Sequence, residues 1–286
     1  MMKGFMGRTH ALLSIMLICI CMLIPLGFFK STIWLAKTDI LFFIVSIIVT
    51  SGGALLPDLD NCQSSAGHTL GPVGSIFTTF MQTISSIMWN LLHKKGDRPP
   101  ETQHRYFWHT LICGIGIVCM FVFGIKGGEQ TIIESIKTSG NFATWIQGNI
   151  ALMFFILLIF GAVLVGSDMV IGKIIKFFKA PKILNYILPA LITIYIFVIN
   201  MTKIKILGIT LGLGYIFHAI EDCFADSGVP ILWPIPIKGQ MWKRIKFLPV
   251  PVKTGSLVNS ALDLVVFVID IILIFLVFYT KTALPV

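Results

Sequence analysis

Charged residues are scarce in this sequence. They make up 12% of its 286 residues, and only 13 are acidic, whereas a soluble globular domain carries about 25% charged residues. Hydrophobic residues make up 56% of the chain, which is more apolar surface than one aqueous core can bury. The composition therefore excludes an ordinary soluble domain and predicts a protein whose solvent is the lipid bilayer.

The sequence also lacks paired cysteine motifs. None of its six cysteines forms a CxxC pair, and four lie in apolar runs, where reduced cysteine behaves as a small hydrophobe. This pattern gives no disulfide framework. The N-terminal region has basic residues followed by an apolar run, but no small-residue cleavage site follows. We therefore interpret this run as a retained first span.

Seven apolar segments predict membrane-spanning helices. The sixth is short and rich in glycine, as expected of a tightly packed or re-entrant helix. The stretch 75–92 is apolar on one side only and is predicted to lie at the membrane interface. We expect a single all-α domain over 1–286, a polytopic transmembrane helical bundle of about seven spans with one interfacial helix. The expected spans are 11–29, 40–57, 106–125, 149–166, 183–201, 205–220 and 257–279.

Lysine and arginine are unevenly distributed between alternate connections of this topology. Fifteen fall on one side and seven on the other. Because basic residues gather in cytoplasmic loops, we expect a cytoplasmic N-terminus. The net charge of +9 follows from this placement and from contact with anionic headgroups, so no nucleic-acid partner is expected.

Imidazoles and carboxylates occur at four helix ends that this topology places on the cytoplasmic face. They fall at the starts of the first and third spans and at the ends of the second and sixth. Ionisable residues at membrane depth are energetically unfavourable, which makes each a functional candidate. The residues are His10, Asp58, Asp60, His104, His109, His218 and Asp222.

These side chains are ligands that suit zinc, manganese or iron. His218 and Asp222 are four residues apart, so on a helix both point to one side. Asp58 and Asp60 are two apart, which aligns their carboxylates in an extended segment. Such a set can hold one or two ions, and two ions about 3.5–4 Å apart clamp the oxygens of a phosphoester. Alone, a His/Asp pair at this spacing is more often a hydrogen-bonded helix end than a ligand pair, and PDLD can be a turn; their convergence favours a metal site.

Four motifs also occur in a recognisable order. They are TH at 9–10, PDLD at 57–60 followed by SS at 64–65, HR at 104–105 with HT at 109–110, and GYIFHAIED at 214–222 leading to GVPILWP at 228–234. Together they resemble the LexA-binding, inner-membrane-associated family of bacterial metal-dependent hydrolases. The resemblance covers most of the chain, although 140–205 match only as hydrophobic helices, and Trp108 and Thr110 depart from the Thr and Ser usual in the family.

The resemblance implies a helical membrane protein whose metal site uses the seven residues above. It also implies distant similarity to zinc-dependent phospholipases C. We therefore expect a membrane-embedded, metal-dependent hydrolase that cleaves a phosphoester of a membrane lipid at the cytoplasmic face of the bacterial inner membrane. Metal coordination lowers the pKa of water from about 15.7 to near 7 and so supplies a nucleophile. Asp58 and Asp60 are the expected catalytic carboxylates, and the planar fork of Arg105 matches phosphate oxygens.

Two other functions remain open from the sequence. A divalent-metal transporter would use the same ligands, although transport sites usually lie near the bilayer midplane. A non-catalytic membrane adaptor would instead bind a cytoplasmic regulator through its loops. The basic stretch 238–246, with Trp242, is expected either to seat the protein on anionic lipid or to act only as an orientation signal.

Overall fold

The structure is a computed structural model, and its regular secondary structure is helical in all the residues that it describes. These are residues 7–23, 40–61, 63–97, 105–125, 130–141, 149–170, 184–225, 227–247 and 257–283. Apart from isolated β-bridges, no strand occurs in these ranges, which confirms the all-α prediction for them. The helices are α1 (Gly7–Leu23), α3 (Ile40–Gly53), α4 (Ser65–Leu92), α5 (Leu111–Gly124), α6 (Ile132–Thr138), α8 (Ile150–Val170), α10 (Leu184–Val198), α11 (Met201–Asp222) and α12 (Leu257–Ala283), with 3-10 turns η1 (Pro57–Asp60) and η2 (Phe107–His109).

Each of the seven predicted spans contains an apolar helix, but the helices differ in length. Among the described residues, three segments are long and apolar enough to cross a membrane: Ile40–Asp60, Met201–Asp222 and Ser260–Val277. The other four are shorter apolar helices: Gly7–Cys21, Leu111–Gly124, Leu152–Asp168 and Pro189–Val198. The sixth predicted span is therefore longer than expected, since α11 has 22 residues.

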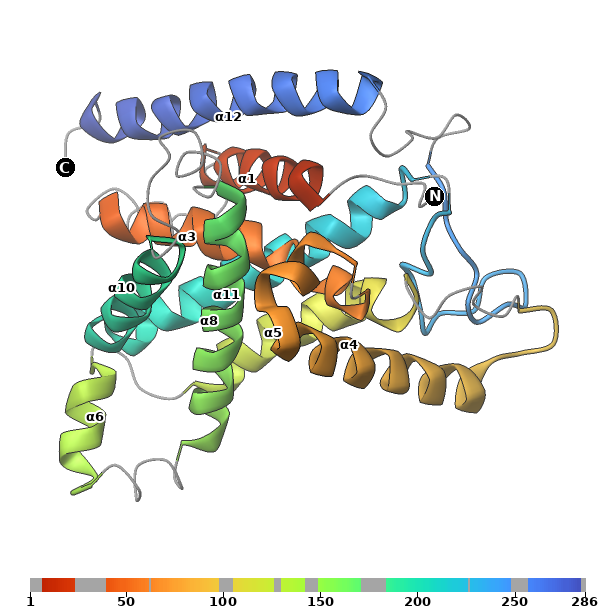
Figure 1. Cartoon of the computed structure of the whole chain (residues 1–286), viewed down its shortest axis with the longest axis horizontal. Helices are drawn as coiled ribbons and strands as arrows, with labels where there is room; N and C mark the ends of the chain where they lie inside the picture. The colour runs from red at the N-terminus through yellow and green to blue at the C-terminus, as the bar shows by residue number, and fades with distance from the viewer. Residues whose placement is uncertain are drawn as a thin grey trace.

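Helix α3 lies at the centre and packs closely against α8 and α11. A Cβ on Gly52 of α3 would lie 1.8 Å from the carbonyl oxygen of Ala162 on α8. A Cβ on Gly214 of α11 would lie 2.1 Å from the carbonyl oxygen of Thr50 on α3. Glycine at these positions lets the helix backbones touch. In Figure 1, α8 runs steeply across α3 rather than alongside it.

Helices α1 and α12 lie side by side and run in the same direction (Figure 1). Near the start of both, the hydroxyl of Thr9 donates a hydrogen bond of 2.6 Å to Asp263 Oδ1. Further along, Ile18 and Cys19 of α1 join one apolar cluster with Val277 of α12. Two neighbouring helices that run parallel begin on the same side of the molecule.

Candidate metal centre

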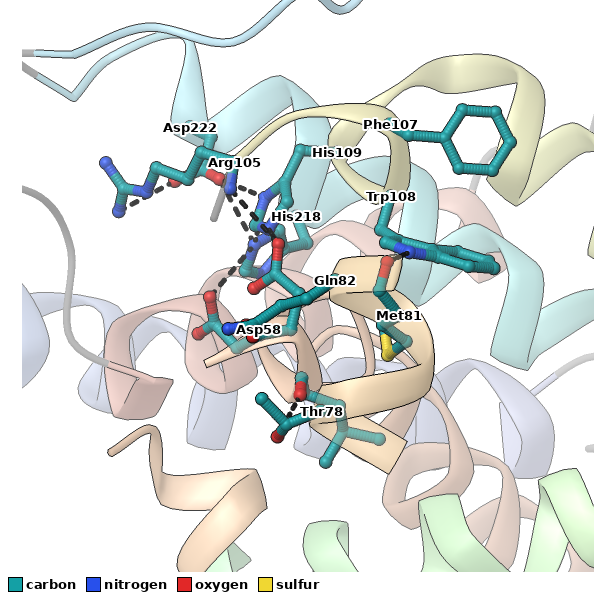
Figure 2. A network of polar contacts seen from close by, with 12 residues as sticks. Asp58, Thr78, Met81, Gln82, Arg105, Phe107, Trp108, His109, His218 and Asp222 are labelled. Carbon is teal, nitrogen blue, oxygen red and sulfur yellow. Dashed lines mark hydrogen bonds and ion pairs between the residues drawn. The ribbon is translucent and has the colours of Figure 1, made fainter. Parts of the chain in front are cut away.

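Six of the seven predicted ligands lie close together where four helices meet. They come from the start of α1, from η1 just after α3, from η2 just before α5, and from the last turns of α11. Figure 2 shows the residues of η1, η2 and α11. His104 lies outside the described residues, as does Asp226. The residues brought together are His10, Asp58, Asp60, His109, His218 and Asp222.

In one group of three donors, two of the three separations match those of atoms that share an ion, and the third is a hydrogen bond. His109 Nδ1 lies 2.6 Å from Asp222 Oδ2, and His218 Nε2 lies 3.2 Å from that oxygen. The two histidine nitrogens are 3.2 Å apart. Bonds of about 2.0–2.1 Å in a tetrahedral zinc site place neighbouring donors about 3.3 Å apart. All three side chains are fully buried, so the cluster presents donors of the right chemistry in a site shielded from water.

A second group of three donors shares His218 with the first. It consists of His10, Asp58 and His218, whose ligand atoms all lie within 4.8 Å of one another. His218 Nε2 is 3.7 Å from Asp58 Oδ1, and the rings of His10 and His218 have centroids 4.0 Å apart. The Nδ1 atom of His218 is buried and has no hydrogen-bond partner among the described residues. The two groups therefore share one residue and form a single candidate metal site.

Local backbone structure aims these side chains. On α11, His218 and Asp222 are one turn apart and share a face, as the sequence spacing predicts. After α3, Pro57 stands at the first position of η1, where its missing N–H is not needed. The η2 turn is fixed to α11 by the Tyr215 hydroxyl, which donates a 2.5 Å hydrogen bond to the carbonyl of Trp108.

Two carboxylates orient the histidines. His10 Nδ1 lies 2.7 Å from Glu221 Oε2, which leaves Nε2 directed toward the cluster, 3.7 Å from Asp222 Oδ1. His109 Nε2 lies 3.4 Å from Asp60 Oδ2. A carboxylate on the second ring nitrogen fixes the tautomer and raises the basicity of a ligating histidine. Asp60 therefore lies behind His109, and it belongs to neither group of three donors.

Sequence reasoning missed Glu221. It adjoins Asp222, and neighbouring helical positions point about 100° apart, so the i, i+4 pattern selected only Asp222. The available signal was the second carboxylate in the motif HAIED itself, on a helix that is otherwise poor in charge.

Arg105 lies at the edge of the cluster. Its Nη2 is 3.1 Å from Asp222 Oδ1, and its Nη1 donates a 2.8 Å hydrogen bond to the hydroxyl of Ser227. Its backbone N–H donates to Asp60 Oδ2 at 3.1 Å. The backbone φ is 63°, a region uncommon for residues other than glycine and frequent at functional sites.

His109 is held in a strongly acidic environment. Asp222 Oδ2 lies 2.6 Å from its Nδ1 and Asp60 Oδ2 lies 3.4 Å from its Nε2, so a carboxylate flanks each ring nitrogen.

Other residues considered from the sequence lie apart from the site. His68 and His93 are exposed, and His93 Nδ1 contacts the Trp89 carbonyl at 3.0 Å. Trp242 is buried, with its ring stacked on Trp233 at a centroid distance of 5.2 Å. The Trp242 ring is therefore inside an aromatic cluster and does not itself contact lipid, whereas lipid contact by the exposed basic residues of 238–246 stays a prediction.

Comparison with known proteins gives no relative: no protein-family model, no curated protein and no solved structure matches this chain. The family resemblance drawn from the motifs therefore stays a prediction, and the function is inferred from the geometry of the candidate metal site.

Proposed function

We propose that this protein is a metal-dependent hydrolase of the bacterial inner membrane that cleaves a phosphoester of a lipid at the cytoplasmic face. The observation that carries the proposal is the buried pair of overlapping donor groups around His218. Nitrogen and carboxylate donors in this number suit zinc best, with manganese and iron as alternatives. The guanidinium of Arg105 beside these donors suits an anionic substrate.

Each residue has a distinct role in the proposal. His109, His218 and Asp222 would hold one ion. The same Nε2 atom of His218 faces both groups and can bind a single ion, so His10 and Asp58 would complete the ligand set of that ion or hold a second ion without His218. An ion bound there supplies Lewis acidity toward a phosphoryl oxygen and activates water. Arg105, whose side chain is 11% exposed, would bind the phosphate with its fork. Asp60 and Glu221 would keep His109 and His10 oriented.

The proposed topology has seven crossings, a cytoplasmic N-terminus and an external C-terminus. The alternation of helix directions supports it: α1 and α5 begin at the metal centre, whereas α3 and α11 lead into it. Basic residues are concentrated on the same side, as cytoplasmic loops require. A lipid headgroup in the inner leaflet would therefore lie on the side of the bundle that holds the centre.

Metal content tests the proposal. The wild-type protein, purified in detergent, would contain about one or two zinc, manganese or iron ions per chain by elemental mass spectrometry. Asp58→Ala and His218→Ala each remove a donor, and His218→Ala removes it from both groups, so bound metal would fall sharply. Metal-loaded wild type would then be screened for phospholipid hydrolysis. Folded protein that takes up no metal under loading conditions would contradict a metallohydrolase.

A divalent-metal transporter is the second candidate, because ionisable groups continue into the apolar part of α12. Asp263 and Asp270 are both buried. Both carboxylate oxygens of Asp270 have no hydrogen-bond partner among the described residues. Metal uptake into proteoliposomes that is lost in Asp270→Asn would favour transport, whereas lipid hydrolysis that persists in Asp270→Asn would favour the hydrolase.

A further inference from the structure

We propose that Thr78 and Gln82 of α4 are positioning residues of the metal centre, and that the opposite face of α4 rests in the lipid–water interface. The proposal depends on the metal centre described above and deepens it. Metal binding at the centre would then depend on the position of α4, a helix that supplies none of the ligands.

The inner face of α4 holds the backbone that carries Asp58 and Asp60. The hydroxyl of Thr78 donates a 2.6 Å hydrogen bond to the carbonyl of Leu59. The amide of Gln82, one turn further along, donates a 2.8 Å hydrogen bond to the carbonyl of Asp60. Two consecutive carbonyls of η1 are thus fixed by side chains of α4, as Figure 2 shows around Thr78 and Gln82.

The same turn of α4 also holds the segment that carries His109. Trp108 Nε1 donates a 2.7 Å hydrogen bond to the carbonyl of Met81, which lies between Thr78 and Gln82 (Figure 2). One turn of α4 therefore contacts both segments, η1 and η2, that carry donors into the centre. A shift of α4 would move Asp58 and His109 relative to α11.

These bonds matter because η1 is only four residues long and cannot hold its own position. The position of the η1 backbone sets the positions of the Asp58 and Asp60 carboxylates. Donors that are misplaced by a fraction of an ångström bind metal poorly. Removing a residue that orients a metal ligand typically costs about 10–100-fold in metal affinity.

The outer face of α4 is apolar and exposed. Ile76 is 70% exposed and Phe80 is 56% exposed, which is unfavourable in water for a whole helix face. Lys94 and Lys95 are exposed just beyond the end of the helix, where they complement anionic headgroups. An apolar face followed by basic residues is typical of a helix lying in the membrane interface. The apolar face comprises Val73, Ile76, Phe77, Phe80, Ile87 and Leu91.

The two neighbouring threonines of α4 give a matched test. Thr78 bonds η1, whereas exposed Thr79 bonds the Ser75 carbonyl of its own helix at 3.0 Å. Full-length protein in nanodiscs of anionic phospholipid would be titrated with zinc against a chromophoric chelator. We expect Thr78→Val and Gln82→Ala to bind zinc about 10–100-fold more weakly than wild type, and Thr79→Val and Thr78→Ser to bind it as wild type does. The visible spectrum of bound cobalt should change in Thr78→Val alone among the threonine variants.

The lipid contact is tested in the same assay. Phe80→Asp places a charge on the apolar face, whereas Asn90→Asp places one at an exposed polar position of the same helix. Phe80→Asp should weaken zinc binding and Asn90→Asp should leave it unchanged. Equal zinc binding by these two variants would overturn the proposed contact between the apolar face of α4 and lipid. If Thr78→Val and Gln82→Ala bind zinc like wild type, the positioning role is overturned while the metal centre stands. A wild type that binds no zinc, manganese or iron would overturn both.

Discussion

Glu221 decides which nitrogen of His10 faces the metal centre. Its Oε2 lies 2.7 Å from His10 Nδ1, which leaves Nε2 as the ring nitrogen that faces Asp222, at 3.7 Å from Oδ1. The carboxylate is 4% exposed and has little contact with water. The contact with His10 explains why a second acidic side chain, Glu221, is buried beside Asp222 although it belongs to neither group of donors.

We expect Glu221→Ala to weaken zinc binding by about 10–100-fold, because His10 loses the partner that fixes its tautomer and ring orientation. Glu221→Gln keeps an oxygen that accepts a hydrogen bond from Nδ1 and should recover most of the affinity. Zinc competition titrations of both variants would measure this. Glu221→Ala with the wild-type affinity would show that the carboxylate has no orienting role.

The convergence of donors could be predicted from the sequence, but their separate roles could not. The distribution of Lys and Arg, combined with the apolar spans, placed His10, Asp58, His109 and His218 on one face, and these residues lie together in the structure. Asp60 has the same chemistry as Asp58, and only the 3.4 Å contact with His109 separates an orienting carboxylate from a donor. Side-chain contacts of this kind depend on distances that sequence spacing does not contain.

At the scale of helices, glycines at the crossings let neighbouring helix backbones pack closely. Gly166 of α8 faces the carbonyl of Ile48 on α3, and a Cβ there would lie 2.2 Å from that oxygen. Gly161 lies on the same helix in open space. Beyond its own helix backbone, no heavy atom of the described residues comes within 4 Å of the place that a Cβ would take. One helix therefore offers a crowded and an open glycine for direct comparison.

Gly166→Ala should lower the stability of the protein by about 1–3 kcal/mol, because the methyl group forces α3 and α8 apart. Gly161→Ala should leave stability unchanged or raise it by up to about 1 kcal/mol through helix propensity. Thermal unfolding of the two purified variants in the same detergent would compare them. A lower melting temperature for Gly161→Ala than for Gly166→Ala would contradict steric crowding of position 166 at the crossing of α3 and α8.

The helical elements were predictable because apolar runs in membrane proteins are long and distinct. The sixth span was underestimated at 205–220, because its glycines and the lysines Lys203 and Lys205 lower the local hydropathy. In the structure the helix begins at Met201, with the side chain of Asn200 accepting a hydrogen bond from the Lys203 N–H. Those glycines are contact points such as Gly208 against Phe121 and Gly214 against Thr50. The contacts of α4 with η1 could not be foreseen, since they join side chains to backbone groups 19 and 22 residues away.

At the scale of the whole molecule, the parallel arrangement of α1 and α12 constrains the topology (Figure 1). Thr9 contacts Asp263 near the start of both helices. If both helices cross the membrane, they cross in the same direction, and an odd number of crossings must separate them. The total is then odd, in agreement with the seven spans expected from the sequence.

An odd number of crossings places the two termini on opposite sides of the membrane. Alkaline phosphatase fused after residue 286 should therefore be active in a bacterial host, because its disulfides form only outside the cytoplasm. Green fluorescent protein fused at the same point should stay dark, and when fused before residue 1 it should fluoresce. A fluorescent C-terminal fusion would contradict the proposed topology.

The enclosure of the ligands has a consequence for the history of any bound ion. His10, His109, His218 and Asp222 are fully buried, whereas Asp58 and Arg105 retain side-chain exposures of 13% and 11%. Among the described residues of the site, these two therefore form the edge that an entering ion can reach, and the positive charge of Arg105 repels cations there. We expect metal loading and removal to be slow under such conditions, so zinc titrations need long incubation to reach equilibrium. Before such equilibration, the ion carried by a purified sample would record which metal was abundant when the chain folded, rather than which metal binds most tightly.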